Sequence, residues 1–304
     1  MSVPRPPHEP GRAPEEDDPM PLDPISVVTL TRRRPEMLRR AMDSVRAQDY
    51  EGEIEHVIVI DDDADSVPTA EQAPSRPGLR VVPHLVRRPA EEVGLPHERR
   101  YTYPRQARLF NEGARRASTP WVAYLDDDNE YEPDHLRTLM RTARASGARA
   151  VHSGRKMLFP DGSPYLDELW HTARHRDLDE AARIYNMMCD RGVWIRGTNH
   201  LMDRADPVRR ETWRPSTVIE PGDPVYLVDQ SSWLIRRDVL MDHPIPETYS
   251  EEDHANNMAP DDKLLQVLLN NEVGIVPTGL PTVRYYLGGV SNLIETPAAP
   301  AAAG

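Results

Sequence analysis

The sequence predicts an α/β fold in which a mostly parallel, twisted sheet is flanked by helices. The first observation is that apolar β-rich runs, such as residues 25–30 and 56–60, alternate with amphipathic helical segments. The second is that the apolar run 121–125 ends in three consecutive aspartates. Burying such a run is favourable and burying three adjacent anions is not, so these carboxylates belong at the exposed end of a buried strand. Strand–helix alternation of this kind indicates right-handed crossovers between parallel strands.

The elements of the first half follow from local patterns. The Val- and Ile-rich runs are typical of strands buried on both faces. Pro35 stands where a first helical turn tolerates proline, and the apolar residues after it recur at helical spacing. The expected elements are, in chain order, a strand at 25–30, a helix from Pro35 to about residue 45, strands at 56–60 and about 79–85, a helix at about 105–117, the strand at 121–125 and a helix from Pro133.

The second half has weaker patterns. We expect strands at 148–158 and 225–235, a short helix at about 261–269 whose acidic first turn suits the helix dipole, and a last core strand at 273–276. Residues 167–223 mix helix signals with aromatic residues and Gly or Pro breaks. This half is therefore expected to be irregular.

The chain divides into four segments. Residues 1–24 contain eight prolines and many charges, so we expect a disordered arm. Residues 25–147 form one half of a single domain and residues 148–295 form the other half. The Ala- and Pro-rich residues 296–304 are expected to be a disordered tail.

Composition excludes several classes of protein. A net charge of −13 argues against a nucleic-acid partner, because affinity for phosphate backbones comes from clustered Lys and Arg. No run approaches the roughly 18 apolar residues that a membrane span needs, and no signal-peptide core is present. The single cysteine, Cys189, rules out an intrachain disulfide framework. We therefore expect a cytoplasmic protein.

Acidic triplets follow two expected strands, at 61–63 and 126–128. One triplet is weak evidence, because Asp is also common in turns and helix caps. Ligands of open α/β sheets bind beyond the carboxyl ends of the strands, and the intervening crossover carries Arg105 and Arg108. Mg²⁺ and Mn²⁺ accept carboxylate and phosphate oxygens. The pattern therefore predicts a ligand with a metal-bound diphosphate, and Mn²⁺ or Mg²⁺ as cofactor.

Several stretches carry a resemblance to a known family. They are 25–28 (ISVV), Thr31 with 34–36 (RPE), 59–62 (VIDD), 111–114 (NEGA) and 125–129 (LDDDN). Together they resemble inverting glycosyltransferases of family 2, and 127–136 resembles the spore-coat polysaccharide nucleotide-sugar transferase branch. The resemblance is good over about 25–145, patchy over 225–275 and absent between. It implies a GT-A fold, which is Rossmann-like, and metal-dependent transfer of a sugar from a nucleoside-diphosphate sugar by single displacement.

The resemblance implies four nucleotide contacts in the first half. Asp62 matches the aspartate that hydrogen-bonds the base, and Thr31 and Arg34 match the loop after the first strand. Arg105 stands where the spore-coat branch has a nucleotide-contacting arginine. Residues 32–33 are both Arg where the family usually has Tyr-Asn, so the resemblance does not carry over the nucleotide contacts of these two positions.

The acidic run is implied to hold the ribose and the metal. Asp127 matches the acid near the ribose, and Asp128 matches the metal-binding acid. Three consecutive aspartates leave the register open by one residue, which would bring in Asp126. Asn129 favours Asp127 and Asp128 in these roles, because the family branch reads Asp-Asp-Asn.

An inverting transfer needs a general base within about 2.6 to 3.2 Å of the acceptor proton. In the family it is an acid at the start of a late helix, which implies Asp261 in this chain. The plain alternative is that Asp261 and Asp262 only favour a helix N-terminus. Asp262, Asp253 and Glu252 are the other candidates. The departing diphosphate would be stabilised by the metal rather than by a protonated side chain.

Sugar and acceptor contacts are expected from the second half. The resemblance favours Asp229, which is followed by small residues, for the sugar pocket. Trp194 and Trp213 suit stacking on a sugar as well as they suit core packing, and we include Trp194 in the pocket; Trp233 favours the core. Other features noted are His254 and His243 as weak metal candidates, residues 192–206 as a lid, and Cys189 as an inert buried thiol.

The expected partners are a donor, most simply a UDP- or TDP-sugar, and a small-molecule, carrier-bound or glycan acceptor, with a homodimer as one option. Hexosyl or N-acetylhexosaminyl transfer is expected. One alternative function is a catalytically degenerate protein that only binds sugar nucleotides. Another is a sugar-nucleotide pyrophosphorylase, which needs a Gly-rich phosphate loop after the first strand, and residues 29–34 contain no glycine.

Overall fold

The computed structural model describes residues 22–72, 74, 76–206, 222 and 224–288. Most of the arm expected at 1–24, the whole tail expected at 296–304 and Trp213 lie outside these residues. Within the described chain, no helix is both long enough and apolar enough to cross a membrane.

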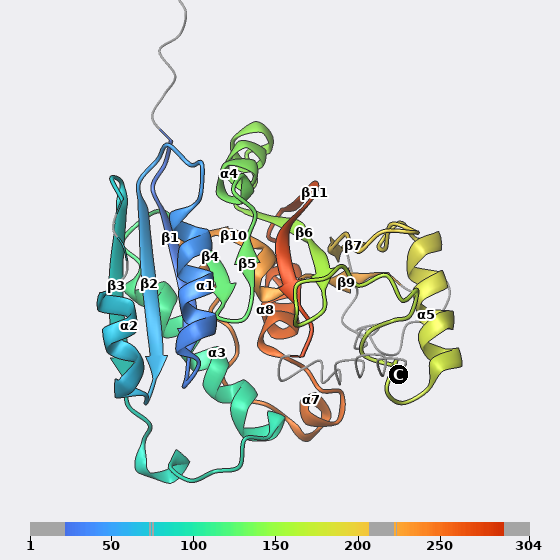
Figure 1. Ribbon diagram of the computed structural model, residues 1–304, viewed down its shortest axis with the longest axis horizontal. Helices are drawn as coiled ribbons and strands as arrows, with labels where there is room; N and C mark the ends of the chain where they lie inside the picture. Colours follow the sequence, from blue (N-terminus) through green and yellow to red (C-terminus); the bar gives the residue numbers. More distant parts are fainter. Residues whose placement is uncertain (1–21, 73, 75, 207–221, 223, 289–304) are drawn as a thin grey trace, which may run out of the picture.

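A curled mixed sheet forms the centre of the described chain (Figure 1). Its strands run in the order β3-β2-β1-β4-β10-β6-β11-β5, with β7 paired to β6, and β8 and β9 form a separate pair. The strands are β1 (Ile25–Thr31), β2 (Ile54–Asp61), β3 (Leu79–Val86), β4 (Trp121–Asp126), β5 (Glu130–Tyr131), β6 (Ala150–Leu158), β7 (His200–Leu201), β8 (Arg204–Ala205), β9 (Tyr226–Leu227), β10 (Trp233–Arg236) and β11 (Ile275–Tyr286).

Helices flank this sheet. They are α1 (Pro35–Arg46), α2 (Val67–Glu71), α3 (Arg99–Arg116), α4 (His135–Ser146), α5 (Leu178–Asp190), α6 (Arg237–Asp242), α7 (Glu251–Ala255) and α8 (Pro260–Asn270). The α/β class and the mostly parallel sheet predicted from sequence are thus confirmed.

The parallel order of β3, β2, β1 and β4 brings their carboxyl ends to one edge. Ile25 at the start of β1 pairs with Ile54 on one side and with Trp121 on the other. The three strands therefore end side by side, at Thr31, Asp61 and Asp126. This edge is where the first half of the chain presents its polar residues.

Alternation along β2 assigns each helix to a face of the sheet. Ile58 and Ile60 pack with α1 and α2, whereas Val57 and Val59 pack with α3. Gly113 explains how closely α3 approaches, since a Cβ at this position would lie 2.2 Å from Cγ1 of Val28 in β1. A side chain there would push α3 away from the strand.

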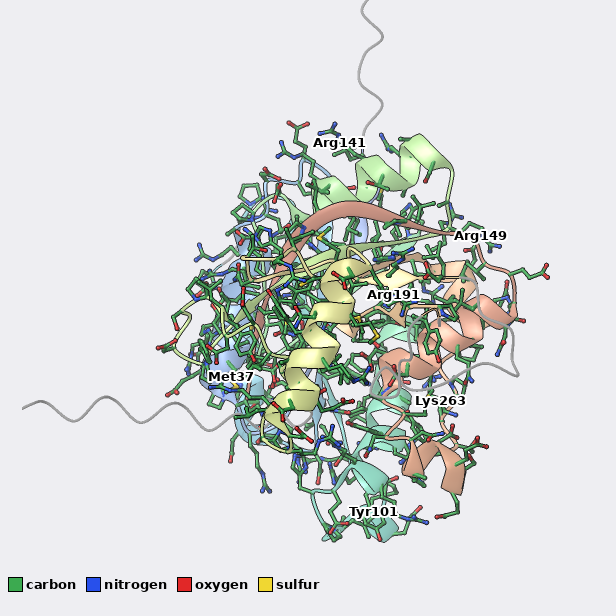
Figure 2. The ribbon with its side chains drawn as sticks, turned by 90° about the vertical axis from the view of Figure 1, so that its right-hand side faces the viewer. Met37, Tyr101, Arg141, Arg149, Arg191 and Lys263 are labelled. Atoms are coloured by element: carbon green, nitrogen blue, oxygen red, sulfur yellow. The ribbon has the colours of Figure 1, made fainter. Side chains whose placement is uncertain are left out.

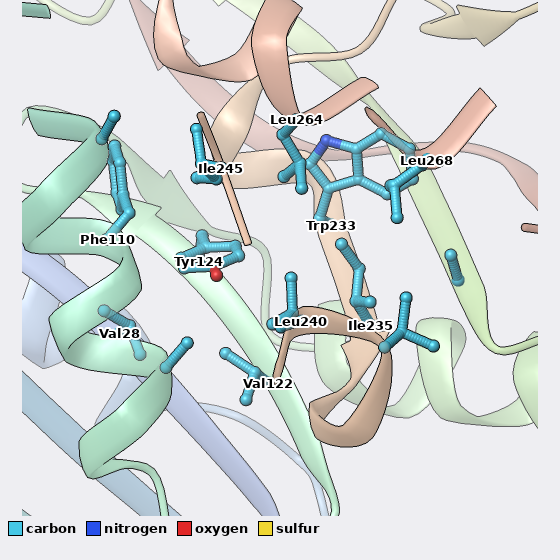
Figure 3. Packing of buried hydrophobic residues seen from close by; sticks show 14 of the residues in the cluster. Val28, Phe110, Val122, Tyr124, Trp233, Ile235, Leu240, Ile245, Leu264 and Leu268 are labelled. Carbon is cyan, nitrogen blue, oxygen red and sulfur yellow. The ribbon is translucent and has the colours of Figure 1, made fainter. Parts of the chain in front are cut away.

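The largest core lies between α3, α8 and the middle of the sheet. Figure 3 shows Phe110 beside Tyr124, whose ring centroids are 5.3 Å apart in an edge-to-face arrangement. In the same view Trp233 packs beneath Leu264 and Leu268 of α8. Trp233 is therefore a core residue, as predicted, and its burial anchors α8 over β10.

A smaller aromatic core supports the second half of the chain. It gathers Tyr185 of α5 with Tyr165, Trp170 and Trp194. This helix stands away from the main sheet in Figure 1 and crosses the front of the molecule in Figure 2. The segment predicted to be irregular thus has a hydrophobic core of its own.

Several element bounds differ from the expectations. Helix α3 begins at Arg99 and runs through Pro104, so it starts earlier than predicted. The strand expected at 225–235 is interrupted by a 3₁₀ turn, Gln230–Ser232, because Asp229 caps this turn by accepting from the Ser231 amide. The last strand, expected at 273–276, extends to Tyr286 along β6.

Candidate active site

A cleft of about 750 Å³ opens at the carboxyl edge of the sheet. It is lined by seven of the nine residues predicted for the site: Thr31, Arg34, Arg105, Asp127, Asp128, Asp229 and Asp261. The two others, Asp62 and Trp194, do not line it. Residues separated by more than two hundred positions in the sequence thus share one cleft.

Asp127 and Asp128 are held by residues of the loop after β1. The Thr31 hydroxyl donates to Asp127 Oδ2 at 2.9 Å. Nη1 of Arg34 donates to Asp127 Oδ1 at 3.2 Å and to Asp128 Oδ2 at 3.1 Å. A single guanidinium nitrogen therefore bridges the two carboxylates, and no other described side chain donates to Asp128.

Asp126, which the open register would bring into the site, has a different environment. Its Oδ2 accepts from the Ser231 hydroxyl at 3.2 Å, and its backbone N–H donates to the same hydroxyl oxygen at 3.1 Å. The amide of Asn129 also donates to Ser231 Oγ, at 3.1 Å. Asp126 thus ties β4 to the turn before β10, whereas Asp127 and Asp128 are held by the loop after β1.

The two aspartates at the end of β2, Asp61 and Asp62, have different surroundings. Asp61, and not Asp62, lines the cleft. Strand β2 continues through Asp61, whose side chain is 9% exposed, whereas the side chain of Asp62 is 29% exposed and lies 3.5 Å from Arg87. Asp62 also has a left-handed backbone with φ of 49°, because the chain turns there. The contact of Asp62 with the base stays a prediction, and Asp61 is the aspartate of this pair that lines the cleft.

Two arginines donate hydrogen bonds to the carboxylate of Asp61. Arg105 donates to Asp61 Oδ1 from Nε at 3.1 Å and from Nη2 at 3.0 Å. Arg88 donates to Asp61 Oδ2 at 2.5 Å. Arg105 therefore lines the cleft, and Arg88, which sequence reasoning missed, completes a cationic end of the cleft beside Arg32.

Asp261 and Asp262 begin α8 and have different surroundings. Asp262 Oδ2 accepts from the Ala259 backbone N–H at 3.0 Å and so caps the helix. Within the described chain, no other residue donates to the carboxylate of Asp261, which lines the cleft. Asp262 thus has the structural role foreseen as the alternative, and Asp261 is the carboxylate left for chemistry.

The other candidate bases and the weak metal candidate have partners or lie elsewhere. Asp253 accepts from Lys263 at 2.7 Å and forms a capping box with Ser250. Glu252 does not line the cleft, and the ring of His254 stacks against Tyr249. Neither acid offers a free carboxylate to the cleft.

Asp229 lines the cleft but is already bonded within the protein. Its Oδ2 accepts from Nη1 of the buried Arg155 at 3.2 Å, and its Oδ1 accepts from the Ser231 amide at 2.9 Å. Arg155 also donates to Asp203 at 2.7 Å. Asp229 therefore acts first as part of a buried ionic network under the cleft, and Arg155 was missed because its partners are distant in sequence.

Trp194 is a core residue and not part of a sugar pocket. Its side chain is 1% exposed, and its ring lies against Tyr165, Trp170 and Tyr185. Its Nε1 donates to the Thr198 carbonyl at 2.8 Å, so its polar atom is also satisfied. No face of this indole is open to a ligand, and the expectation of stacking on a sugar was wrong.

Crowding of carboxylates raises their pKa values. Burial, followed by the charge of Asp128, raises the pKa of Asp127 to about 7. Burial raises the pKa of Asp128, against the opposing effect of Arg34. Burial and the negative charges of Asp262 and Asp229 raise the pKa of Asp261 well above its usual range. The cleft thus concentrates negative charge that the protein only partly compensates.

The oxygen donors of this cleft suit a hard divalent ion. The described residues contain no group of three or more His, Cys, Asp or Glu side chains arranged to hold a metal by themselves. Mg²⁺ and Mn²⁺ are often held by only one or two carboxylates, with phosphate oxygens and waters completing the octahedron. Asp128, with Asp127 beside it, fits that mode of binding.

Part of the chain matches a known family. Residues 99–243 match the model of glycosyl transferase family 2. The match includes residues 146–224, where no resemblance was noted, and does not include β1 and β2. No curated protein matches the chain.

Solved structures that match the chain include TarS and a mannosyltransferase. S. aureus TarS 1–349 in complex with UDP-GlcNAc is 13% identical, with a TM-score of 0.48; the match covers 86% of this chain and 58% of that one. The mannosyltransferase PcManGT from Pyrobaculum calidifontis, in complex with GDP-Man and Mn²⁺, is 16% identical, with a TM-score of 0.46, and the match covers 87% of this chain and 56% of that one. The chain therefore spans less than two thirds of either structure.

Proposed function

Residues 99–243 belong to glycosyl transferase family 2, and we propose from this that the protein is a metal-dependent inverting glycosyltransferase. Its donor would be a nucleoside-diphosphate sugar, and its acceptor a small molecule, a carrier-bound intermediate or a glycan. The GT-A fold expected from the resemblance is confirmed by the family match and the mostly parallel sheet. The spore-coat branch stays a prediction.

One observation carries the proposal. Asp127 and Asp128 after β4, Thr31 and Arg34 after β1, and Asp261 at the start of α8 all line the same cleft. A nucleotide-binding half (25–147) and an acceptor and base half (148–295) would meet there. We propose that Thr31, Arg34, Arg105 and Asp127 contact the nucleotide, with Asp61 in place of Asp62 near the base.

The metal would be held by Asp128, with Asp127 beside it. When bound, Mn²⁺ or Mg²⁺ supplies positive charge to the departing diphosphate. Arg34 already bridges the two carboxylates, so it is placed to exchange one of them for a phosphate oxygen. This exchange would release carboxylate oxygens for the ion without leaving the guanidinium unpaired.

Asp261 would act as the general base. Its oxygen takes the proton of the acceptor hydroxyl or amine, whose heavy atom forms a bond to the anomeric carbon. The bond from that carbon to the diphosphate oxygen breaks, and the configuration inverts because attack is from the opposite side. Burial and the neighbouring carboxylates raise the pKa of Asp261, which makes this carboxylate more basic.

Calorimetry and donor turnover test this function. The protein would be titrated with UDP-, TDP- and GDP-sugars in the presence and absence of Mn²⁺, and release of nucleoside diphosphate would be followed. Binding that needs Mn²⁺ together with turnover supports the transferase. Binding without turnover against any acceptor panel supports the degenerate sugar-nucleotide binder, and no heat with any donor contradicts both.

A further inference from the structure

Gln230 lines the cleft, and its buried amide has no hydrogen-bond partner among the residues that the structure describes. The residue is 4% exposed and lines the cleft. Within the described chain, neither its Nε2 nor its Oε1 makes a hydrogen bond. A buried polar group left unsatisfied costs stability, so such groups in native proteins call for an explanation. Both atoms are shielded from solvent in the ligand-free protein, so a ligand in the cleft supplies the missing partners once the side chain turns toward it.

Its neighbours show which part of a ligand Gln230 would meet. Gln230 lies between Asp229 and Ser231, and the Ser231 hydroxyl is bonded to Asp126. Asp126 directly precedes Asp127 and Asp128, where the metal and the diphosphate would be bound. The group attached to that diphosphate is the sugar to be transferred, so Gln230, next to Ser231 in the chain, belongs to the part of the lining that would face the sugar.

The charge around Gln230 restricts that sugar. Asp126, Asp128, Asp229 and Asp261 all line the cleft together with Gln230. Arg155, the cation beneath them, is committed to Asp203 and Asp229. Even with a divalent ion at Asp128, a sugar carboxylate would therefore lie among the carboxylates of Asp126, Asp229 and Asp261, whereas a neutral sugar adds no charge.

We propose that Gln230 is a specificity-determining residue whose carboxamide binds a neutral substituent of the transferred sugar. An amide presents a donor and an acceptor side by side, so its complement is a pair of adjacent hydroxyls or an acetamido group. The inference rests on the proposed function. It assigns a neutral hexose or N-acetylhexosamine as the sugar and rejects a uronic acid.

The test replaces Gln230 with Met, which has a similar length and no amide. Binding would be measured by calorimetry with Mn²⁺ and four probes: UDP, UDP-glucose, UDP-N-acetylglucosamine and UDP-glucuronate, with GDP and GDP-mannose as a parallel series. We expect Gln230→Met to bind the diphosphates as the wild type does and to bind the preferred neutral nucleotide sugar about 10-fold more weakly, the scale of one to two neutral hydrogen bonds. UDP-glucuronate should bind the wild type at least about 10-fold more weakly than UDP-glucose.

Gln48 provides the matched control. It is also buried, but its Nε2 donates to the Glu132 carbonyl at 2.8 Å and its Oε1 accepts from the Leu136 amide at 3.0 Å. Gln48→Met should lower the Tm and leave sugar selectivity unchanged. Gln230→Met should keep or raise the Tm of the ligand-free protein, because it removes an unsatisfied amide.

The outcomes separate the role of Gln230 from the proposed transferase function. Equal loss of affinity for the diphosphate and the nucleotide sugar, or no loss for either, would overturn the role of Gln230 while leaving the transferase intact. A lower Tm in Gln230→Met would show that the amide has partners in the free protein, and tight binding of UDP-glucuronate would overturn the charge argument. If no diphosphate or sugar nucleotide binds the wild type, the proposed function itself has failed.

Discussion

Replacing Asp261 with Asn tests the assignment of the general base. The substitution preserves the size of the side chain and removes its ability to take a proton. No other described residue donates to this carboxylate, and its pKa is raised by burial and by nearby negative charges. Removing the charge therefore relieves repulsion, and we expect the Tm of Asp261→Asn to equal or exceed that of the wild type.

The expected loss is in turnover. A positioned general base contributes about 10²- to 10⁴-fold, which at 1.36 kcal/mol per tenfold corresponds to about 3–5 kcal/mol of activation free energy. Release of nucleoside diphosphate from a bound sugar nucleotide would be measured with Mn²⁺ and excess acceptor, or with water as acceptor. Binding of the sugar nucleotide, measured by calorimetry, should change less than about 3-fold because Asp261 does not face the diphosphate in the proposed arrangement.

Asp262→Ala is the control at the adjacent position. Asp262 caps α8 through the Ala259 amide, so its loss should cost about 1 kcal/mol of stability. Turnover of the folded Asp262→Ala protein should stay within about 10-fold of the wild type. Wild-type turnover in Asp261→Asn, or a deeper loss in Asp262→Ala, would refute the assignment.

Three further predictions follow from the cleft. Asp128→Ala should abolish Mn²⁺-dependent binding of sugar nucleotides, while the exposed Asp43→Ala should not; retained dependence on Mn²⁺, measured by calorimetry, would remove Asp128 as the metal ligand. Asp61→Ala should weaken nucleotide binding about 10-fold or more and Asp62→Ala less than about 3-fold, since only Asp61 lines the cleft; the reverse order would restore the register expected from sequence. The pKa of Asp127 is raised from 3.8 to about 7, so the folded protein holds this proton more tightly than the unfolded chain, and the stability it confers is complete below about pH 4 and lost as pH rises through about 7. Urea unfolding of the ligand-free protein should therefore show a free energy of unfolding that falls by roughly 2–4 kcal/mol from about pH 4 to about pH 8 for this group, and Asp127→Asn should flatten that fall; an unchanged slope would contradict the raised pKa.

Features that depend on residues close together in the sequence could be predicted. The strands β1, β2 and β4 are apolar on both faces because helices cover both, so their sequences reveal them. The position of Asp261 at a helix start follows from Pro260 and the apolar run after it. These features need no knowledge of which segments meet in space.

The remaining features depend on contacts between residues that are distant in the sequence. Asp61 and Asp62 differ in role because β3 continues the pairing of β2 through Asp61 to Val86, and the turn begins only at Asp62. Trp194 is buried by a second aromatic core that no periodic pattern announces. Arg155 and Gln230 were missed because the partners of the first, and the lack of described partners of the second, exist only in the folded chain.

The distribution of charge along the cleft explains why its two acidic ends differ. At the end formed by β2, the carboxylate of Asp61 accepts hydrogen bonds from two arginines, so two positive charges face one negative charge. At the end formed by β4 and α8, Arg34 serves two carboxylates. The arginine beneath this end, Arg155, is shared with the buried Asp203, which does not line the cleft.

This asymmetry orients a ligand without reference to any relative. The cationic end offers hydrogen-bond donors to a polar, acceptor-rich group such as a base, and neither needs nor favours a metal. The anionic end gathers several carboxylates. Without a cation their repulsion is relieved by protonation, which is why the pKa values of Asp127 and Asp261 are raised. A divalent ion carried on a diphosphate relieves it at the working pH without protonation. We propose on this basis that the base lies over β2 and the reacting sugar over β4 and α8, so that the diphosphate and its ion reach the carboxylates of the anionic end.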